Sequence, residues 1–426
     1  MKLNYTRTFF MGLAFLSICA FWQLYDNVIP LILKNTFGLK ETVTGTVMAL
    51  DNVLAIFLLP IFGALSDKTN TSLGKRTPFI IIGTLISVIF MIILPVADKG
   101  NNFILFVGAL FILLIGMGSY RSPAVALMPD LTPKPLRSKA NAIINLMGAA
   151  GGIYTLIMIK LLVNNEVRPD YLPVYISIGL LMVTAVIVLV LTIREKKLLS
   201  EMALSDSDNI EKIEELDNDE NQDLNADVKK SLILLLLSIF LWFTAYNAVT
   251  TAFSRYAGEV WGLHGGSYAN NLLVATGAAI ISYIPIGIIS SRIGRKKTIL
   301  TGIILITISY IAGSLFTNYS PLINIVFALT GIGWASINVN SYPMVVEMSK
   351  GADVGKYTGL YYTFSMAAQT VTPILSGFFL EHISYRTLFP YAVVFSVMSF
   401  STMFFVKHGD VKPIKKTVLE NFDIDD

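Results

Sequence analysis

The chain has 426 residues, of which 54% are hydrophobic and only 14% are charged, whereas soluble proteins carry roughly 25% charged residues. This deficit of charge predicts that most of the surface faces lipid, and the small net charge of +3 argues against nucleic acid as a partner. The single cysteine, Cys19, excludes a disulfide framework, and the three histidines fall in separate predicted loops or helix ends, so no metal site is expected.

Twelve apolar segments follow one another, each long enough for a membrane-spanning helix, which needs roughly 20 residues. They lie near 9–33, 43–66, 77–96, 103–128, 138–163, 171–193, 231–257, 268–291, 298–317, 321–348, 355–380 and 386–406. The first is too long for the core of a signal peptide, so we expect it to be retained as a helix. The expected fold class is an all-α polytopic membrane protein with twelve transmembrane helices in two six-helix bundles. The expected domains are 1–193, a linker over 194–230, a second bundle over 231–406 and a tail over 407–426.

Basic residues are distributed unevenly between the two sets of loops. With the N-terminus inside, 24 Lys and Arg residues fall on the cytoplasmic side and seven on the outer side. Because basic loops stay in the cytoplasm, both termini are expected there. The short loops suit a bacterial cell membrane. We expect a multi-pass monomer in the lipid bilayer, without a folded soluble domain.

The predicted linker begins with basic residues and then becomes acidic. Residues 201–227 contain 11 Asp and Glu residues and no aromatic residue. Such a segment buries too little apolar surface to offset the entropy lost on ordering, so a mobile tether is predicted. A regulatory role for this segment is the alternative.

The two halves of the sequence resemble each other at corresponding segments. The matches are Trp22-x-x-Tyr25 with Trp242-x-x-x-Tyr246, Pro60 to Asp67 with Pro285 to Arg292, and Gly116-x-Gly118 with Gly331-x-Gly333. This duplication is typical of carriers whose two halves rock around a central site.

Two stretches carry a more specific pattern. One is Gly63-Ala-Leu-Ser66-Asp67-(x)6-Gly74-Lys75-Arg76-Thr-Pro78, and the other runs from Arg121-Ser-Pro123 through Pro129-Asp130 to Ala140-Asn141-Ala142. They resemble the major facilitator superfamily, in the form found in sucrose carriers and glycoside–pentoside–hexuronide:cation symporters. The resemblance implies secondary transport by alternating access, with helices 1, 4, 7 and 10 lining the cavity.

The chain departs from these relatives at the acidic residues that couple transport to a cation. By alignment on the first pattern, the sodium-binding acids of the melibiose-permease branch fall on Ala55, Leu59 and Arg121, and near Cys19. The helix-4 acid of the plant sucrose carriers falls close to Leu114. Because the hard oxygen ligands of a sodium site are missing, a proton is the expected coupling ion and no other cofactor is expected.

Asp26 and Asp51 are the candidates for cation coupling, because both lie inside apolar segments at similar depth. A carboxyl group in a low-dielectric medium can bind and release a proton near neutral pH. Arg121 is also inside a segment, where a charge is costly and seldom without a function. It can pair with Asp51 in one state or donate to sugar hydroxyl groups. The alternative is structural, with the acids paired in the bundle or placed at a helix break at Pro30.

A sugar site needs aromatic faces and groups that both donate and accept hydrogen bonds. The predicted substrate-binding residues are Trp22, Gln23, Tyr25, Asn27, Asn52, Tyr120, Asn145, Tyr246, Asn247, Asn338, Asn340, Tyr361 and Gln369. The alternative is ordinary helix packing, because amides inside membranes often serve only to hold helices together.

A different set of charged residues is predicted to latch the cytoplasmic gate, as the resemblance implies. Asp67 is expected to meet Lys75 and Arg76 near a helix end. Two further pairs are predicted, Asp130 with Arg137 and Glu347 with Arg292. The alternative is that these basic loops only set the topology.

The predicted function is therefore a proton-coupled symporter for a sugar or glycoside, such as sucrose or another α-glucoside. No Walker motif, nucleophile–base pair or metal-ligand spacing is present, which disfavours an ATP-driven pump or an enzyme. The alternatives are a proton-driven exporter of drugs or metabolites, and a uniporter or sensor in which the acids are structural. The many amides in the predicted cavity favour sugar.

Overall fold

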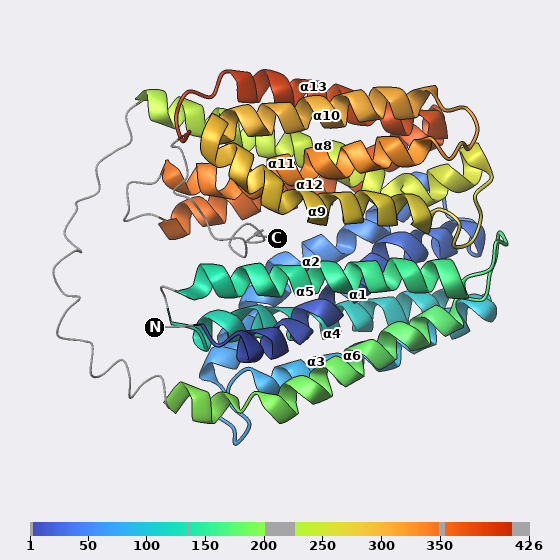
Figure 1. The fold of residues 1–426 in the computed structure, drawn as a ribbon. Coiled ribbons are helices and arrows are strands. Elements are labelled where there is room, and N and C mark those ends of the chain that lie inside the picture. The colour runs from blue at the N-terminus through green and yellow to red at the C-terminus, as the bar shows by residue number, and fades with distance from the viewer. Residues whose placement is uncertain (1–2, 134–135, 201–225, 349–353, 411–426) are drawn as a thin grey trace. The chain divides into compact units, whose positions relative to one another are not determined.

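The computed structural model describes residues 3–133, 136–200, 226–348 and 354–410, which are almost entirely helical (Figure 1). The helices are α1 (Tyr5–Asn35), α2 (Glu41–Lys68), α3 (Thr77–Lys99), α4 (Phe103–Asp130), α5 (Arg137–Leu162), α6 (Leu172–Thr192), α8 (Ala226–Trp261), α9 (Ala269–Ile293), α10 (Arg295–Leu315), α11 (Ile323–Glu347), α12 (Val354–His382) and α13 (Leu388–Phe404), with a 3₁₀ turn, η3 (Tyr385–Thr387). In the described residues the only β pairing is one bridge between Thr71 and Gly74.

Eleven of these helices are long and apolar enough to cross a membrane. The twelfth, α12, has 29 residues but a more polar sequence with several hydroxyl side chains. Large apolar side chains face outward, for example Ile104 at 85% and Ile281 at 76% exposure, which in a membrane protein is the surface that meets lipid. The predicted helical membrane fold is confirmed, and the chain is a multi-pass membrane protein.

The helices group into two compact units. Unit 1 comprises 1–37 and 51–218, and unit 2 comprises 38–50 and 219–426, so the first ten residues of α2 group with unit 2. In unit 1, α1 packs on α5 and α6, and α3 packs on α4 and α6. In unit 2, α8 packs on α12 and α13, and α10 packs on α11 and α13. The same packing pattern therefore occurs in both halves, as the internal repeat predicts.

Several helix ends differ from the prediction. Helix α8 begins at Ala226, before the predicted end of the linker at 230, and residues 195–200 are also helical. The rest of the predicted linker, 201–225, and the tail beyond 410 lie outside the described residues. The helix break at Pro30, considered as an alternative reason for the acids, is not present, because α1 continues through Pro30 to Asn35. Proline is tolerated within transmembrane helices because neighbouring groups satisfy the freed backbone carbonyl.

Close helix packing depends on a glycine in each unit. A Cβ atom on Gly151 of α5 would lie 2.0 Å from the carbonyl oxygen of Leu16 on α1. In unit 2, a Cβ atom on Gly331 of α11 would lie 2.1 Å from the carbonyl oxygen of Ala275 on α9. Small residues let membrane helices approach until their backbones touch, and these contacts hold the helices that carry the candidate site residues.

Candidate functional site

Two carboxyl groups lie inside unit 1 at nearly the same depth. Asp26 is nine residues before the end of α1, and Asp51 is ten residues after the start of α2. At 1.5 Å per residue, both lie about 14 Å from the end of the bundle where α1 stops and α2 starts. Both side chains are partly buried, and the two carboxyl groups are close enough to interact electrostatically.

Polar neighbours surround this pair of acids. The amide nitrogen of Asn52 donates to Oδ1 of Asp51 over 2.8 Å. The buried hydroxyl group of Tyr25 is within electrostatic range of both carboxyl groups. Arg121 on α4 interacts electrostatically with Asp51, and in the described part of the chain it forms no ion pair within 4 Å. These groups form an acid–arginine cluster (Tyr25, Asp26, Asp51, Asn52 and Arg121) whose charge balance changes when one proton binds.

Trp22 joins the acid–arginine cluster to an aromatic surface on α1. The guanidinium carbon of Arg121 lies 5.7 Å from the centre of the Trp22 ring, which is a cation–π distance. The Trp22 ring also contacts Tyr25 edge to face, with centroids 5.3 Å apart. The indole N–H of Trp22 is buried and has no acceptor among the described residues. It is therefore a donor that a ligand could satisfy.

Two other predicted substrate residues of unit 1, Tyr120 and Asn27, are engaged within the bundle. The hydroxyl group of buried Tyr120 bonds to the hydroxyl group of Ser17 and to the carbonyl of Ala14 at 3.0 Å. The amide nitrogen of buried Asn27 donates to the carbonyl of Gln23 at 2.9 Å. These contacts hold α1 and α4 together and shape the local backbone. The side chains of Gln23 on α1 and Asn145 on α5 are partly buried.

In unit 2 the predicted residues Tyr246 and Tyr361 belong to one aromatic cluster together with Phe243 and Trp334. Tyr246 on α8 stacks on Trp334 of α11, with ring centroids 3.7 Å apart and planes at 5°. Phe243 packs edge to face on Trp334 at 5.2 Å and reaches Tyr361 of α12 at 6.5 Å. The Asn247 side-chain amide nitrogen, one residue after Tyr246, is buried without an acceptor in the described residues. Unit 2 thus presents a flat aromatic pair beside a free amide donor.

The remaining predicted residues of unit 2 differ in how fully they are engaged. Asn340 is buried and donates to the carbonyl of Ser336 at 2.9 Å, one turn earlier in α11. The hydroxyl group of Tyr361 lies 3.3 Å from that of Ser341. Asn338 is also buried, whereas Gln369 on α12 is partly buried. Asn340 therefore supports its own helix, and Asn338 and Gln369 stay predicted substrate residues.

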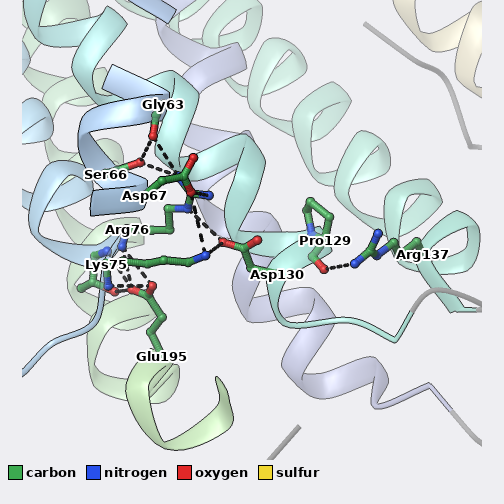
Figure 2. A network of polar contacts seen from close by, with 10 residues as sticks. Gly63, Ser66, Asp67, Lys75, Arg76, Pro129, Asp130, Arg137 and Glu195 are labelled. Atoms are coloured by element: carbon green, nitrogen blue, oxygen red, sulfur yellow. Dashed lines mark hydrogen bonds and ion pairs between the residues drawn. The ribbon is translucent and has the colours of Figure 1, made fainter. Parts of the chain in front are cut away.

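At one end of unit 1, Arg76 joins three segments (Figure 2). Its side chain donates to Asp130 of α4 at 2.9 Å and to Asp67 of α2 at 2.5 Å, and also to the hydroxyl group of Ser66. Lys75 lies 3.0 Å from Asp130. The structure therefore brings together the expected Asp67, Lys75 and Arg76, and adds Asp130. Their gating role stays a prediction.

Glu195, which sequence reasoning missed, binds the backbone of the same loop (Figure 2). Its carboxylate accepts the backbone N–H groups of Lys75, Arg76 and Thr77 at 2.9 Å each, and the hydroxyl group of Thr77 at 2.7 Å. It is fully buried. A carboxylate at the start of α3 is favoured by the helix dipole and satisfies free N–H groups. The signal available in the sequence was one acid between Arg194 and Lys196.

Two predicted latches are wrong. Arg137 donates to the carbonyls of Pro129 and Thr132, at 2.8 and 3.2 Å, and not to Asp130. Pro129 lies in the last turn of α4, whose carbonyls have no helical partner, and Thr132 follows the helix, so a nearby arginine satisfies both carbonyls, while Asp130 is occupied by Arg76. Glu347 at the end of α11 pairs with Arg295 and not with Arg292.

The corresponding end of unit 2 repeats the arrangement around Arg76. Gly294 and Gly74 both adopt a left-handed backbone, with φ of 96° and 119°. In each unit an arginine just after this glycine pairs with an acid at the end of a neighbouring helix. Asp410, which follows α13 as Glu195 follows α6, accepts the backbone N–H of Lys296 at 3.0 Å. We call each arrangement a clasp. The clasp of unit 1 consists of Asp67, Arg76, Asp130 and Glu195, and that of unit 2 consists of Arg295, Glu347 and Asp410.

Near the C-terminal end of α8, Arg255 forms a buried ion pair within unit 2. Arg255 Nε donates to Glu41 Oε2 over 2.7 Å, and the two side chains are only 2% and 4% exposed. Tyr385 also donates to Glu41 at 2.5 Å. Nearby, hydrogen bonding from Thr42 lowers the pKa of the Glu381 carboxyl group. The sequence analysis counted Arg255 on the outer side, at the end of the predicted span 231–257, whereas α8 continues to Trp261 and Arg255 is buried in the bundle.

Comparison with known proteins places this fold and these motifs in one family. The model of the Major Facilitator Superfamily matches residues 11–283 and 235–423. The chain is 27% identical over 151 residues to the sucrose transport protein SUC3 of Arabidopsis thaliana, covering 31% of this chain and 25% of that protein. It is equally similar to the sucrose transport protein SUT3 of Oryza sativa subsp. indica, covering 31% and 30%. These matches thus span less than a third of either relative's length.

Solved structures of transporters share the fold along nearly the whole chain. The nucleoside transporter NupG superposes with a TM-score of 0.68 at 15% identity, covering 94% of this chain and 100% of that one. The xylose transporter XylE from E. coli superposes with a TM-score of 0.64 at 15% identity, covering 95% of each. These structures share the fold, and the family model, which matches most of the chain, shows that the chain belongs to the Major Facilitator Superfamily; as a member of that family it is a membrane transporter rather than an enzyme.

Proposed function

We propose that this chain is a secondary active transporter that carries a sugar or glycoside, such as sucrose or another α-glucoside, together with protons by alternating access. The observation that carries this proposal is the acid–arginine cluster, in which Asp26, Asp51 and Arg121 interact inside an apolar bundle. Charged groups at such a depth are costly and usually have a transport function. The similarity to sucrose transport proteins supports the substrate class.

In this proposal the proton is held by Asp51 or Asp26. Protonation of Asp51 removes the negative charge that attracts Arg121. The guanidinium, already beside the Trp22 ring, is then available to donate to sugar hydroxyl groups. Loss of the proton restores the attraction and withdraws the donor. Sugar binding and proton binding thereby favour each other, which is the requirement for symport.

Each unit supplies groups suited to a sugar. In unit 1 these are the Trp22 ring and its free indole N–H. In unit 2 they are the Tyr246–Trp334 stack and the Asn247 amide. Aromatic faces pack against the C–H faces of sugar rings, and buried donors without partners make discrimination for a hydroxylated ligand strong. We also propose that both termini are cytoplasmic, on the bias of basic loops, so that the clasps lie on the cytoplasmic side.

The test is proton movement in proteoliposomes containing a trapped pH dye. Mono- and disaccharides are added outside without a sodium gradient, to wild type, Asp51→Asn and the control Glu166→Gln, whose side chain is exposed in a loop. We expect one α-glucoside to acidify the lumen in wild type and control, and Asp51→Asn to lose this signal while retaining sugar counterflow. Unchanged uphill uptake by Asp51→Asn would show that Asp51 is structural. No signal with any sugar, with sodium restored as a check, would favour an exporter or a uniporter.

A further inference from the structure

We propose that unit 2 carries a binding site for an anionic phospholipid, in a groove formed by the end of α9, the start of α10 and the end of α13. The groove has a volume of about 640 Å³ and opens to the outside of the bundle. Two basic residues, Arg292 and Lys297, line it together with apolar side chains that include Leu300, Ile304, Phe400 and Phe404.

The groove has the chemistry of a lipid, with charge at one end and hydrocarbon along its length. From Lys297 to Ile304 its α10 wall is seven residues long, about 10 Å. Ile304 is 44% exposed and Phe404 is 57% exposed, on helices apolar enough to cross a membrane. An acyl chain can therefore lie on these side chains while the two cations meet a phosphate at the level of the helix ends.

The two cations are not used inside the protein. Arg295 is paired with Glu347, and the Nζ atom of Lys296 donates to the carbonyl of Phe404 at 2.8 Å. Arg292 and Lys297 are exposed, and neither forms an ion pair in the part of the chain that the structure describes. The failure of the predicted Arg292–Glu347 pair thus leaves a free arginine on the wall of an apolar groove.

The position in unit 1 that corresponds to Arg292 carries an acid rather than a free cation. By the internal repeat, Arg292 corresponds to Asp67. In unit 1 that aspartate accepts a hydrogen bond from Arg76 and so joins its own clasp. In unit 2 the same position carries a positive charge, which cannot pair with Arg295 and points to an anion supplied from outside. In a bilayer the anions at this depth are lipid headgroups.

The test is native mass spectrometry of the full chain in detergent, with dioleoyl phosphatidylglycerol as ligand and dioleoyl phosphatidylcholine as the neutral comparison. The groove variant is Arg292→Gln with Lys297→Gln. The matched control is Lys229→Gln with Lys230→Gln, which removes two exposed cations at the start of α8. A second variant, Ile304→Trp, fills the groove without changing charge. Thermal unfolding of each variant reports whether it is folded.

We expect wild type to bind one phosphatidylglycerol at least tenfold more tightly than phosphatidylcholine. The groove variant should lose about thirtyfold in affinity, because each basic residue near a membrane surface contributes about fivefold. Ile304→Trp should also bind more weakly, and the control should match wild type. Equal binding of the two lipids, or equal loss in groove variant and control, would overturn the proposal. Displacement of the lipid by an equal concentration of glycerol 3-phosphate would also overturn it, because the site would then recognise phosphate alone.

Discussion

Removing the Glu195 carboxylate should open the start of α3 without disturbing the rest of the bundle. In Glu195→Ala, three backbone N–H groups, those of Lys75, Arg76 and Thr77, lose their acceptor. A buried donor left unsatisfied costs about 1–3 kcal/mol, and water entering the space left by the side chain offsets part of this. We therefore expect the local free energy of opening to fall by about 3 kcal/mol, which corresponds to roughly 150-fold faster exchange.

Hydrogen–deuterium exchange measures this directly. The peptide covering residues 74–80 should lose protection in Glu195→Ala, and Glu195→Gln should be intermediate because one carbonyl oxygen remains as acceptor. The corresponding peptide of unit 2, residues 294–300, is the internal control. In the reciprocal variant Asp410→Ala only that second peptide should respond, and by less than about fivefold, because Asp410 accepts a single, exposed N–H.

Unchanged exchange over residues 74–80 in Glu195→Ala would refute this reasoning. It would mean that the side-chain contacts of Arg76 to Asp67 and Asp130 hold the loop alone. A loss of protection in both clasps would also contradict it, because the two networks lie in separate units and share no residue. Either result would show that Glu195 does not act through the backbone of this loop.

Three further substitutions test other parts of the structure. Arg255→Met should destabilise the protein by about 3–5 kcal/mol, because it removes the cation that pairs with the buried Glu41 carboxylate. Adding Glu41→Leu should restore most of the lost thermal stability, and no recovery would contradict this account. Gly151→Leu should reduce the yield of monodisperse protein in gel filtration, because its Cβ would overlap an α1 carbonyl; a normal yield would refute this packing. Hydrogen bonding from Thr42 depresses the pKa of the Glu381 carboxyl group. The ionised carboxylate therefore stabilises the folded protein above the usual carboxyl pKa, and this stabilisation is lost as pH falls through the depressed pKa. The melting temperature of Glu381→Gln should therefore lie below wild type at neutral pH and meet it in acid, and a difference that persists in acid would contradict the assignment.

The helices could be predicted from the sequence because the bilayer leaves few alternatives. An apolar run of about 20 residues must satisfy its own backbone hydrogen bonds, so each run forms a helix whatever it packs against. Local spacing was also sufficient for the contact of Asp67 with Arg76, which are nine residues apart on either side of a tight loop. The depth of Asp26 and Asp51 followed in the same way, because rise per residue is constant along a helix.

Contacts between distant helices could not be predicted, because they depend on how each helix is rotated about its axis. Glu195 reaches an N–H group 120 residues away, and Arg255 meets Glu41 across 214 residues. Arg292 and Arg295 are three residues apart, and only the turn at Gly294 decides which of them faces Glu347 and which faces the groove. Hydropathy and charge along the chain thus determined how many membrane helices form, in which stretch of sequence each one lies, and that the two halves repeat. The tertiary structure alone decided which charges are paired and which stay free, because helix rotation follows from side-chain packing across the whole bundle.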